Sequence, residues 1–148
     1  YDIDPITELL LFSSARSELM AENVLPSLQQ GDTVILDRFY DSTTAYQGYG
    51  RQSVSLDEIR TINAIASHKR APDLTIYMDI PLEQAKRRMG NDKDRMEQAG
   101  DQFFENVIKG FRELAKTEQR FFKVDATLPA DQVHARIWEY VQSQFSRR

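Results

Sequence analysis

The sequence predicts an α/β fold, a three-layer α/β/α sandwich around a parallel sheet. Two observations carry this prediction. Short apolar runs, partly β-branched and without polar alternation, are typical of strands buried on both faces of a parallel sheet. These runs alternate along the chain with longer segments of helical periodicity, which is the order that right-handed βαβ units produce.

A helix is the first predicted element. Apolar residues recur at helical spacing over residues 7–30, and Gly31 follows as a C-cap signal. Pro26 lacks the backbone N–H that an interior turn needs, so we expect it to bend the last turns. Residues 33–36, an apolar run without alternation, predict the first strand, and the polar pair at 37–38 ends it.

The middle of the chain predicts a second helix, a second strand and a third helix. Ser55 and Glu58 are spaced as a capping box, which opens a helix over residues 55–67. Residues 74–78 form the second apolar run. Pro81 suits the first turn of a helix that ends at about residue 89.

The last third predicts a helix over residues 103–118, a strand over residues 121–124 and a final helix. Three strands are fewer than the about five of an ordinary sheet, so either the sheet is small or a strand-bearing segment is absent. No repeat, low-complexity tract or linker interrupts the pattern, and we expect a single domain over residues 1–148. The inward stripe of the final helix consists of Val133, Ile137, Tyr140 and Val141.

Composition narrows the functional classes. With 19 Lys and Arg against 23 Asp and Glu, the net charge of −4 argues against a general binder of nucleic acid or of a membrane surface. The absence of cysteine excludes a disulfide scaffold and a thiolate metal site, and His68 and His134 are too far apart to suggest zinc. No apolar run of membrane-spanning length and no signal-peptide pattern is present, so the cytoplasm is the expected location.

Residues 37–51 contain most of the candidate ligand-binding side chains. They follow the first predicted strand, and ligands of open α/β sheets bind beyond the carboxyl ends of strands. The segment holds two arginines, which suit a phosphate. It also holds several hydroxyls and an amide, which suit a base edge, and aromatic rings, which suit a base face. Composition alone leaves open a solvated loop with a helix cap at Asp41 or Ser42.

The stretch DRFYDSTTAYQGYGR at residues 37–51 resembles the signature of the thymidylate kinase family, which belongs to the P-loop nucleoside monophosphate kinases. The stretches ELLLFSSAR at 8–16, PDLTIYMD at 72–79 and DRME at 94–97 resemble further motifs of this family. The resemblance implies a P-loop NTPase-like fold and transfer of a phosphoryl group from ATP, with Mg²⁺, to dTMP in dTTP biosynthesis. It also implies a cytoplasmic homodimer that pairs through helices such as those at 7–30 and 55–67.

The resemblance implies roles for four residues near the acceptor. Phe12 would stack on the thymine, and Arg16, on the same helix face, would reach toward the base or the monophosphate. Arg38 would clamp the phosphate of dTMP, while Asp37 would orient it or hold the magnesium shell through water. Without the signature, Phe12 reads as a core residue, Arg16 as a surface charge and Asp37 as a turn former.

Four further residues complete the implied acceptor site. Thr43 and Gln47, four residues apart, would hydrogen-bond the thymine edge. Tyr46 would pack near the deoxyribose and exclude a ribose 2′-hydroxyl. Arg51 would add positive charge near the phosphates, and its other interpretation is a surface salt-bridge partner.

Residues 90–97 resemble the lid of nucleoside monophosphate kinases. Arg87 and Arg88 precede this segment and Arg95 lies in it. Such arginines would stabilise the charge that develops on the transferred phosphoryl group. Met89 stands where some family members carry an arginine, so which of the three arginines is catalytic stays open.

The phosphate-binding loop Gly-x-x-x-x-Gly-Lys-Ser/Thr occurs nowhere in the 148 residues. In the family this loop follows the first strand, ahead of the stretch that matches residue 1, so we expect the chain to lack that strand and its loop. We then expect dTMP recognition and lid elements without kinase activity. The alternatives are another deoxynucleoside or nucleotide kinase, or a non-catalytic dimerising relative that lacks the P-loop.

Overall fold

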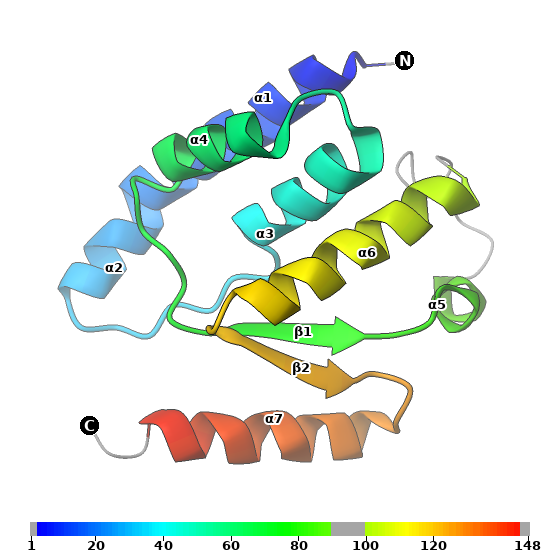
Figure 1. Cartoon of the computed structure of the whole chain (residues 1–148). Coiled ribbons are helices and arrows are strands. Elements are labelled where there is room, and N and C mark those ends of the chain that lie inside the picture. The colour runs from blue at the N-terminus through cyan, green and yellow to red at the C-terminus, as the bar shows by residue number, and fades with distance from the viewer. Residues whose placement is uncertain (1–2, 90–99, 146–148) are drawn as a thin grey trace. The chain divides into compact units, whose positions relative to one another are not determined.

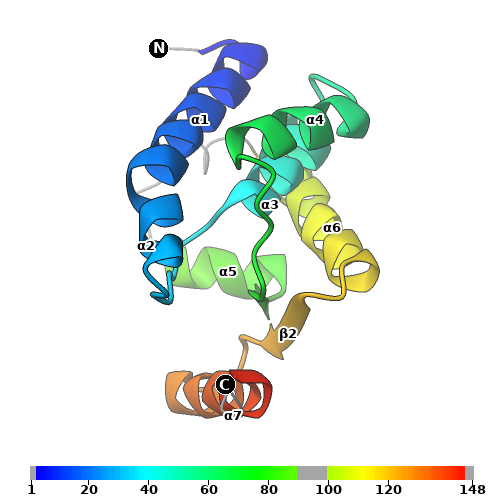
Figure 2. The same ribbon diagram turned by 90° about the vertical axis from the view of Figure 1, so that its left-hand side faces the viewer.

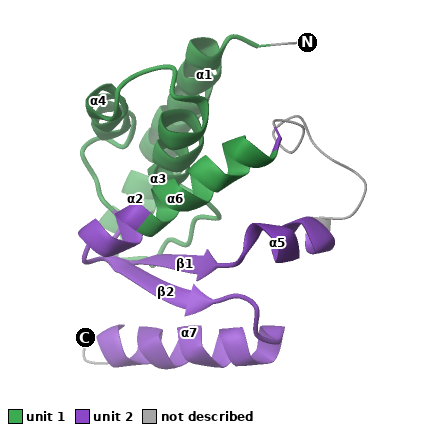
Figure 3. Ribbon diagram, turned by 45° about the vertical axis from the view of Figure 1, so that its right-hand side comes forward, with its two compact units in different colours: residues 1–71, 101–112 green, residues 72–100, 113–148 purple. Residues whose placement is uncertain are grey.

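The computed structural model describes residues 3–89 and 100–145. It is a helix-rich α/β structure with a parallel two-stranded sheet, which confirms the predicted fold class and is consistent with a P-loop NTPase-like kinase fold (Figure 1). The chain divides into two compact units (Figure 3). Unit 1 comprises residues 1–71 and 101–112, and unit 2 comprises residues 72–100 and 113–148.

In unit 1, helix α1 (Pro5–Leu19) begins at Asp4. The Asp4 carboxylate accepts a hydrogen bond from the backbone N–H of Thr7 at 2.9 Å, and a proline follows at the first helical position. The first N–H groups of a helix have no partner within it; the Asp4 carboxylate pairs one of them, and the proline has no N–H to pair. The helix buries Leu9 completely.

The helix continues through a widened π-helical turn, η1 (Met20–Val24), into α2 (Leu25–Gln29). The change of register comes one turn before Pro26, which has no N–H to donate to the carbonyl four residues earlier. The helix thus changes its hydrogen-bond register just before Pro26, and the predicted bend of its last turns stays a prediction. Gly31, at φ +88°, ends the helix in the left-handed conformation that a glycine C-cap adopts.

The first predicted strand is absent. Residues 32–36 form no β-ladder, and the only sheet in the described part of the chain pairs two later strands. The side chain of Ile35 is 90% exposed. A strand exists only through hydrogen bonds to a neighbouring strand, and among residues 3–89 and 100–145 this run has no such neighbour.

The next helical segment joins α3 (Tyr40–Thr43) to the π-helical η2 (Thr44–Arg51). It begins after Phe39 without a side-chain cap, and Asp41 lies inside it with only 4% of its surface exposed. The alternative of a solvated loop capped at Asp41 or Ser42 is therefore wrong. Gln52, at φ +54°, ends the segment.

Helix α4 (Leu56–Ala66) begins with the predicted capping box. The Ser55 hydroxyl accepts the Glu58 N–H at 3.3 Å, and the Glu58 carboxylate accepts the Ser55 N–H at 2.8 Å. The helix buries Ile59 and packs against α1 and η2. Figure 2 shows α4 beside α1.

Helix α6 (Asp101–Thr117) contributes its first part to unit 1. There Phe103 and Val107 are buried, and two glycines let the backbones approach. A Cβ on Gly50 of η2 would lie 2.5 Å from the Phe103 ring, and one on Gly110 would lie 2.8 Å from Tyr49. Only a residue without a side chain fits at either position.

Unit 2 holds the sheet. Strands β1 (Thr75–Asp79) and β2 (Phe121–Asp125) pair in parallel, with Thr75 opposite Phe121 and Asp79 opposite Asp125. Helix α7 (Ala130–Phe145) packs on β2, where the rings of Phe122 and Tyr140 stack at 3.9 Å (Figure 1). Helix α5 (Leu82–Met89) follows β1. No helix in the described part of the chain is long and apolar enough to span a bilayer.

Candidate functional site

Most of the predicted acceptor residues lie in unit 1 on two helical segments, α1 and the α3–η2 segment. Both segments carry functional side chains at intervals of four residues, so each row lies along one side of its segment. Hydrogen bonds join the two rows at both ends. The rows are Glu8, Phe12 and Arg16 on α1, and Thr43, Gln47 and Arg51 on α3–η2.

Arg16 marks one end of these rows. Its Nη2 donates to the Thr43 hydroxyl, and its Nη1 donates to the Asn63 side-chain oxygen at 3.3 Å. The Asn63 amide nitrogen in turn donates to the Tyr40 carbonyl at 3.3 Å and to the Thr44 hydroxyl at 3.0 Å. Asn63, only 5% exposed, therefore fixes Arg16 and the start of the α3–η2 segment from α4.

The charge of Arg16 is partly withdrawn from water. Burial lowers the pKa of Arg16 below its ordinary value, and the neighbouring Asp41 carboxylate raises it in turn. Arginine remains protonated at neutral pH even so. The site therefore holds a half-buried positive charge, one helical turn from the Phe12 ring, which is 49% exposed. Phe12 is thus not a core residue.

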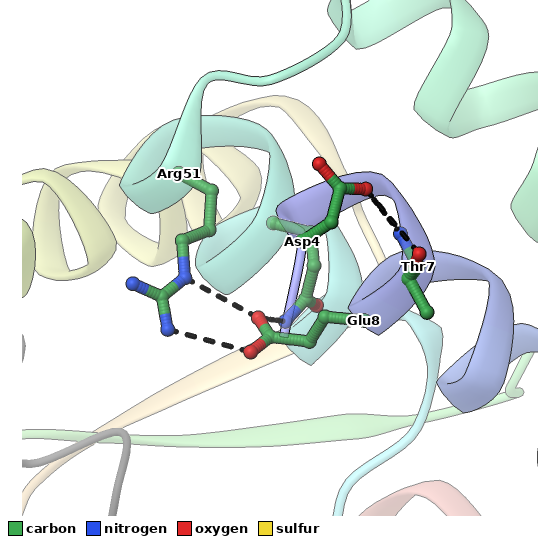
Figure 4. A network of polar contacts seen from close by, with 5 residues as sticks. Asp4, Thr7, Glu8 and Arg51 are labelled. Atoms are coloured by element: carbon green, nitrogen blue, oxygen red, sulfur yellow. Dashed lines mark hydrogen bonds and ion pairs between the residues drawn. The ribbon is translucent and has the colours of Figure 1, made fainter. Parts of the chain in front are cut away.

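Glu8 marks the other end of the rows (Figure 4). Its carboxylate is 2% exposed and accepts hydrogen bonds from Arg51 Nε at 3.3 Å and from Arg51 Nη2 at 3.4 Å. The amide nitrogen of Gln47 donates to the same carboxylate at 3.1 Å. Arg51, whose side chain is 23% exposed, is thus paired with a buried carboxylate, so it is not a surface salt-bridge partner.

Asp37 and Arg38 lie in the turn before α3, and both side chains are exposed. The Arg38 backbone has φ +68°, in the left-handed region that a non-glycine residue seldom adopts. Its guanidinium lies 5.4 Å from the centre of the Tyr46 ring. Among the residues that the structure describes, no carboxylate forms an ion pair with Arg38.

Tyr46 is half-buried in an aromatic cluster. Its ring lies edge-on to Phe103 at 6.0 Å and to Phe111 at 6.3 Å, both on α6. The Arg51 guanidinium lies over the same Phe103 ring at 4.8 Å. One face of η2 is therefore anchored on α6, which fixes the position of Tyr46.

The other predicted residues belong to unit 2 or lie outside the described residues. Arg87 and Arg88 are exposed on α5 of unit 2, and Arg95 lies outside the described residues, as does the predicted lid at 90–97. No group of three or more His, Asp or Glu side chains that could hold a metal ion occurs among residues 3–89 and 100–145. Asp37 offers a single carboxylate, which suits Mg²⁺ that is held mainly by phosphates and water.

Sequence reasoning missed two residues of the cluster. Asn63 lies between Ile59 and Ala66 on the buried stripe of α4, so a polar side chain at an apolar position was a usable signal. Glu8 lies within the quoted motif, but no local pattern shows that its carboxylate is buried. Its partners lie 39 and 43 residues away in the sequence.

The arrangement suits a planar ring with an attached anion. The Phe12 ring, 49% exposed, offers a stacking face one helical turn from Arg16. The Arg16 guanidinium lies 5.8 Å from the centre of the Phe39 ring and donates to the hydroxyl of Thr43, which is 2% exposed. The exposed guanidinium of Arg38 is a group that can bind a phosphate. Side chains of these kinds can bind the base and the phosphate of a nucleotide.

Comparisons with known proteins point the same way. The profile of the family described as Thymidylate kinase matches residues 1–137. A thymidylate kinase of Chlorobaculum parvum is 44% identical over 154 residues, covering 96% of this chain and 70% of the relative. One of Chlorobium luteolum is 42% identical, covering 100% and 74%, and one of Dehalococcoides mccartyi is 44% identical, covering 94% and 67%.

Proposed function

Because the chain belongs to the thymidylate kinase family, we propose that α1 and the α3–η2 segment form its dTMP site. The reaction we propose is transfer of the γ-phosphoryl group of ATP to dTMP, which yields dTDP for dTTP biosynthesis in the cytoplasm. One observation carries the proposal. Arg16 of α1 meets Thr43 of the α3–η2 segment and is held there by Thr43 and Asn63, and Phe12 lies one helical turn before Arg16 on α1.

The base binds between these three side chains. Phe12 stacks on the thymine ring, since its exposed side chain is aromatic and carries no polar group, unlike those of Arg16 and Thr43. The Arg16 guanidinium has five N–H donors, and its contacts with Thr43 and Asn63 engage two of its nitrogens. A thymine carbonyl can take a further donor, and the Thr43 hydroxyl can share its hydrogen bond with the base.

The phosphate of dTMP binds Arg38. A strained backbone persists only where the surroundings demand it, and such residues concentrate at functional sites. The left-handed turn projects the Arg38 side chain over the Tyr46 ring, beside the place where we put the deoxyribose. Asp37 next to it holds the water shell of Mg²⁺. That ion supplies positive charge that neutralises the phosphate oxygens during transfer.

The remaining residues have supporting roles. Tyr46, fixed on α6, sets the room beside the sugar and disfavours a ribose 2′-hydroxyl. Gln47 and Arg51 are directed at Glu8, so any contact they make with dTMP comes in addition to that bond. Arg87, Arg88 and Arg95 are the candidates for stabilising the charge of the transferred group.

We further propose a homodimer that pairs through α1 and α4. These helices expose large apolar side chains, with Leu10 52%, Leu11 58% and Ile65 70% exposed. Such surfaces on neighbouring helices suit a protein partner. Sedimentation equilibrium of the chain and of Ile65→Lys tests this pairing, which the lysine should weaken. A monomeric wild-type chain would contradict it.

Calorimetric titration with dTMP, dUMP, UMP and thymidine tests the proposed site. We expect dTMP to bind more tightly than thymidine, which lacks the phosphate, and than UMP, which carries the 2′-hydroxyl. Phe12→Ala should weaken dTMP binding about fivefold or more, since base stacking on an aromatic side chain contributes about 1–3 kcal/mol.

Leu19→Ala is the matched control, because Leu19 is an exposed apolar residue of α1 that belongs to neither the proposed site nor the proposed dimer surface. It should bind dTMP like the wild-type chain. Preference for another nucleoside or nucleotide would favour the alternative of a different kinase. Absence of binding would favour a non-catalytic dimerising relative.

A further inference from the structure

Glu8 is a buried charge with no role in the site as proposed so far. Its side chain is 2% exposed, although it lies near the start of α1, where a glutamate can easily face water. A carboxylate removed from water is strongly disfavoured unless it is paired and hydrogen-bonded. Something must therefore hold this carboxylate in place.

Gln47 and Arg51, which both donate to Glu8, come from one segment, η2. Arg51 donates through two nitrogens, Nε to one carboxylate oxygen and Nη2 to the other, in the paired geometry of an arginine–carboxylate fork (Figure 4). Gln47, one turn earlier on η2, adds a third donor at 3.1 Å. The Phe103 ring covers the Arg51 guanidinium at 4.8 Å and restricts its movement.

This fork is far from the other polar link between the two segments. Glu8 and Arg16 are eight residues apart, roughly 12 Å along a helix axis. Arg16 holds Thr43 at its end, and Glu8 holds Gln47 and Arg51 at the other end. Two links at separate points fix both the position and the direction of α1 against the α3–η2 segment. Phe12 lies on α1 between them.

We propose that Glu8 is a positioning residue of the dTMP site, whose buried carboxylate holds η2 through Arg51 and Gln47 and so sets the distance between Phe12 and Thr43. The inference rests on the proposed function, because it assumes that the base binds at these two side chains. Glu8 touches no substrate atom in this role. Removing its charge alters where the base-binding groups stand and leaves Arg38 untouched.

A double-mutant cycle on Glu8→Gln and Arg51→Gln tests the role. Affinities for dTMP and for thymidine are measured by calorimetry, and the folded fraction by circular dichroism. We expect each single variant to lose about tenfold in affinity, within the range that residues of one ion-pair network show. The double variant should lose no more than either single variant, because both changes break the same link.

Thymidine is the diagnostic ligand. Since the disturbance lies on the base side, thymidine and dTMP should lose affinity by the same factor. Glu18→Gln is the matched control, because Glu18 is an exposed glutamate on the same helix, and it should bind both ligands like the wild-type chain. Arg51→Lys, which keeps the charge but not the fork, should give a smaller loss in the same direction.

The outcomes separate the two proposals. If the wild-type chain binds no dTMP, the proposed function fails, and the role of Glu8 fails with it. If the wild-type chain binds dTMP and the folded Glu8→Gln protein binds it equally well, Glu8 is a structural residue only and the proposed function stands. If Glu8→Gln does not fold, Arg51→Lys decides, and unchanged affinity in that variant overturns the positioning role.

Discussion

Arg38 occupies a left-handed backbone conformation, at φ +68°, in a turn where glycine would be less strained. The left-handed region costs an ordinary residue roughly 1–2 kcal/mol. The contact of the guanidinium with Tyr46 recovers only about 0.5–1 kcal/mol at an exposed site. Local stability therefore does not account for an arginine at this position, whereas the phosphate contact that we propose for Arg38 does.

Replacing Arg38 by glycine and by alanine separates strain from function. Both variants should lose dTMP affinity, because neither carries the guanidinium. Arg38→Gly should be more stable than Arg38→Ala by about 1 kcal/mol, since the strain of roughly 1–2 kcal/mol that glycine relieves exceeds its entropic cost of about 0.5–1 kcal/mol. Urea denaturation measures the difference. An alanine variant as stable as the glycine variant would mean that the turn is not strained.

At the scale of elements, the α3–η2 segment is fixed on several sides. α1 holds it through Arg16 and Glu8, and α4 holds it through Asn63. On α6 it packs so closely that Gly50 leaves no room for a Cβ beside Phe103. A candidate binding segment held in this way has its side chains in place before the ligand arrives, which reduces the ordering cost of binding.

The packing of η2 against its neighbours, α6 at Gly50 and α4 at Gly48, predicts different outcomes at these two glycines. Gly50→Ala should destabilise the protein by about 1–3 kcal/mol, because its Cβ would lie 2.5 Å from the Phe103 ring. Gly48→Ala is the comparison, since its Cβ would meet the flexible tip of Leu56 at 3.0 Å. There the gain in helix propensity, about 1 kcal/mol, offsets the contact. Equal thermal stability of the two variants would contradict the close approach.

The capping box of α4 predicts a dependence on pH. Hydrogen bonds from Ser55 hold the pKa of Glu58 below its ordinary value of 4.5. A depressed carboxylate pKa stabilises the fold above the ordinary value, and this stabilisation is lost as the pH falls through the lower, folded value.

The melting temperature should therefore differ between wild type and Glu58→Gln at pH 7, and the difference should shrink as the pH falls below 4.5. Glu105→Gln, at an exposed position of α6, controls for the loss of one charge. A constant difference across this range would show that the carboxylate is not what stabilises the cap.

At the scale of the whole molecule, the family profile runs across both compact units, from residue 1 to residue 137. This favours the predicted single domain, which stays a prediction. The candidate acceptor site lies wholly in unit 1, whereas Arg87 and Arg88 belong to unit 2. Acceptor recognition can therefore be tested on the chain apart from the chemistry of transfer.

We expect residues 1–148 alone to show no kinase activity with ATP and dTMP. The 148 residues hold no Gly-x-x-x-x-Gly-Lys-Ser/Thr loop, whose backbone amides and lysine would hold the ATP phosphates. A coupled assay for dTDP measures this, with the Chlorobaculum parvum thymidylate kinase as positive control. Turnover above background by the chain would show that another group holds the donor phosphates.

The sequence by itself determined the type of most elements and the family. These were recognised from local patterns: helical periodicity, the capping box at Ser55 and the motif at residues 37–51. Local patterns can be recognised in the sequence without a structure. Only the tertiary structure decided the rest. Residues 33–36 have the composition of a strand but pair with no other strand in the described chain. Glu8 and Asn63 gained their roles from partners that lie 19 or more residues away in sequence, because burial and hydrogen bonding depend on which segments meet in space.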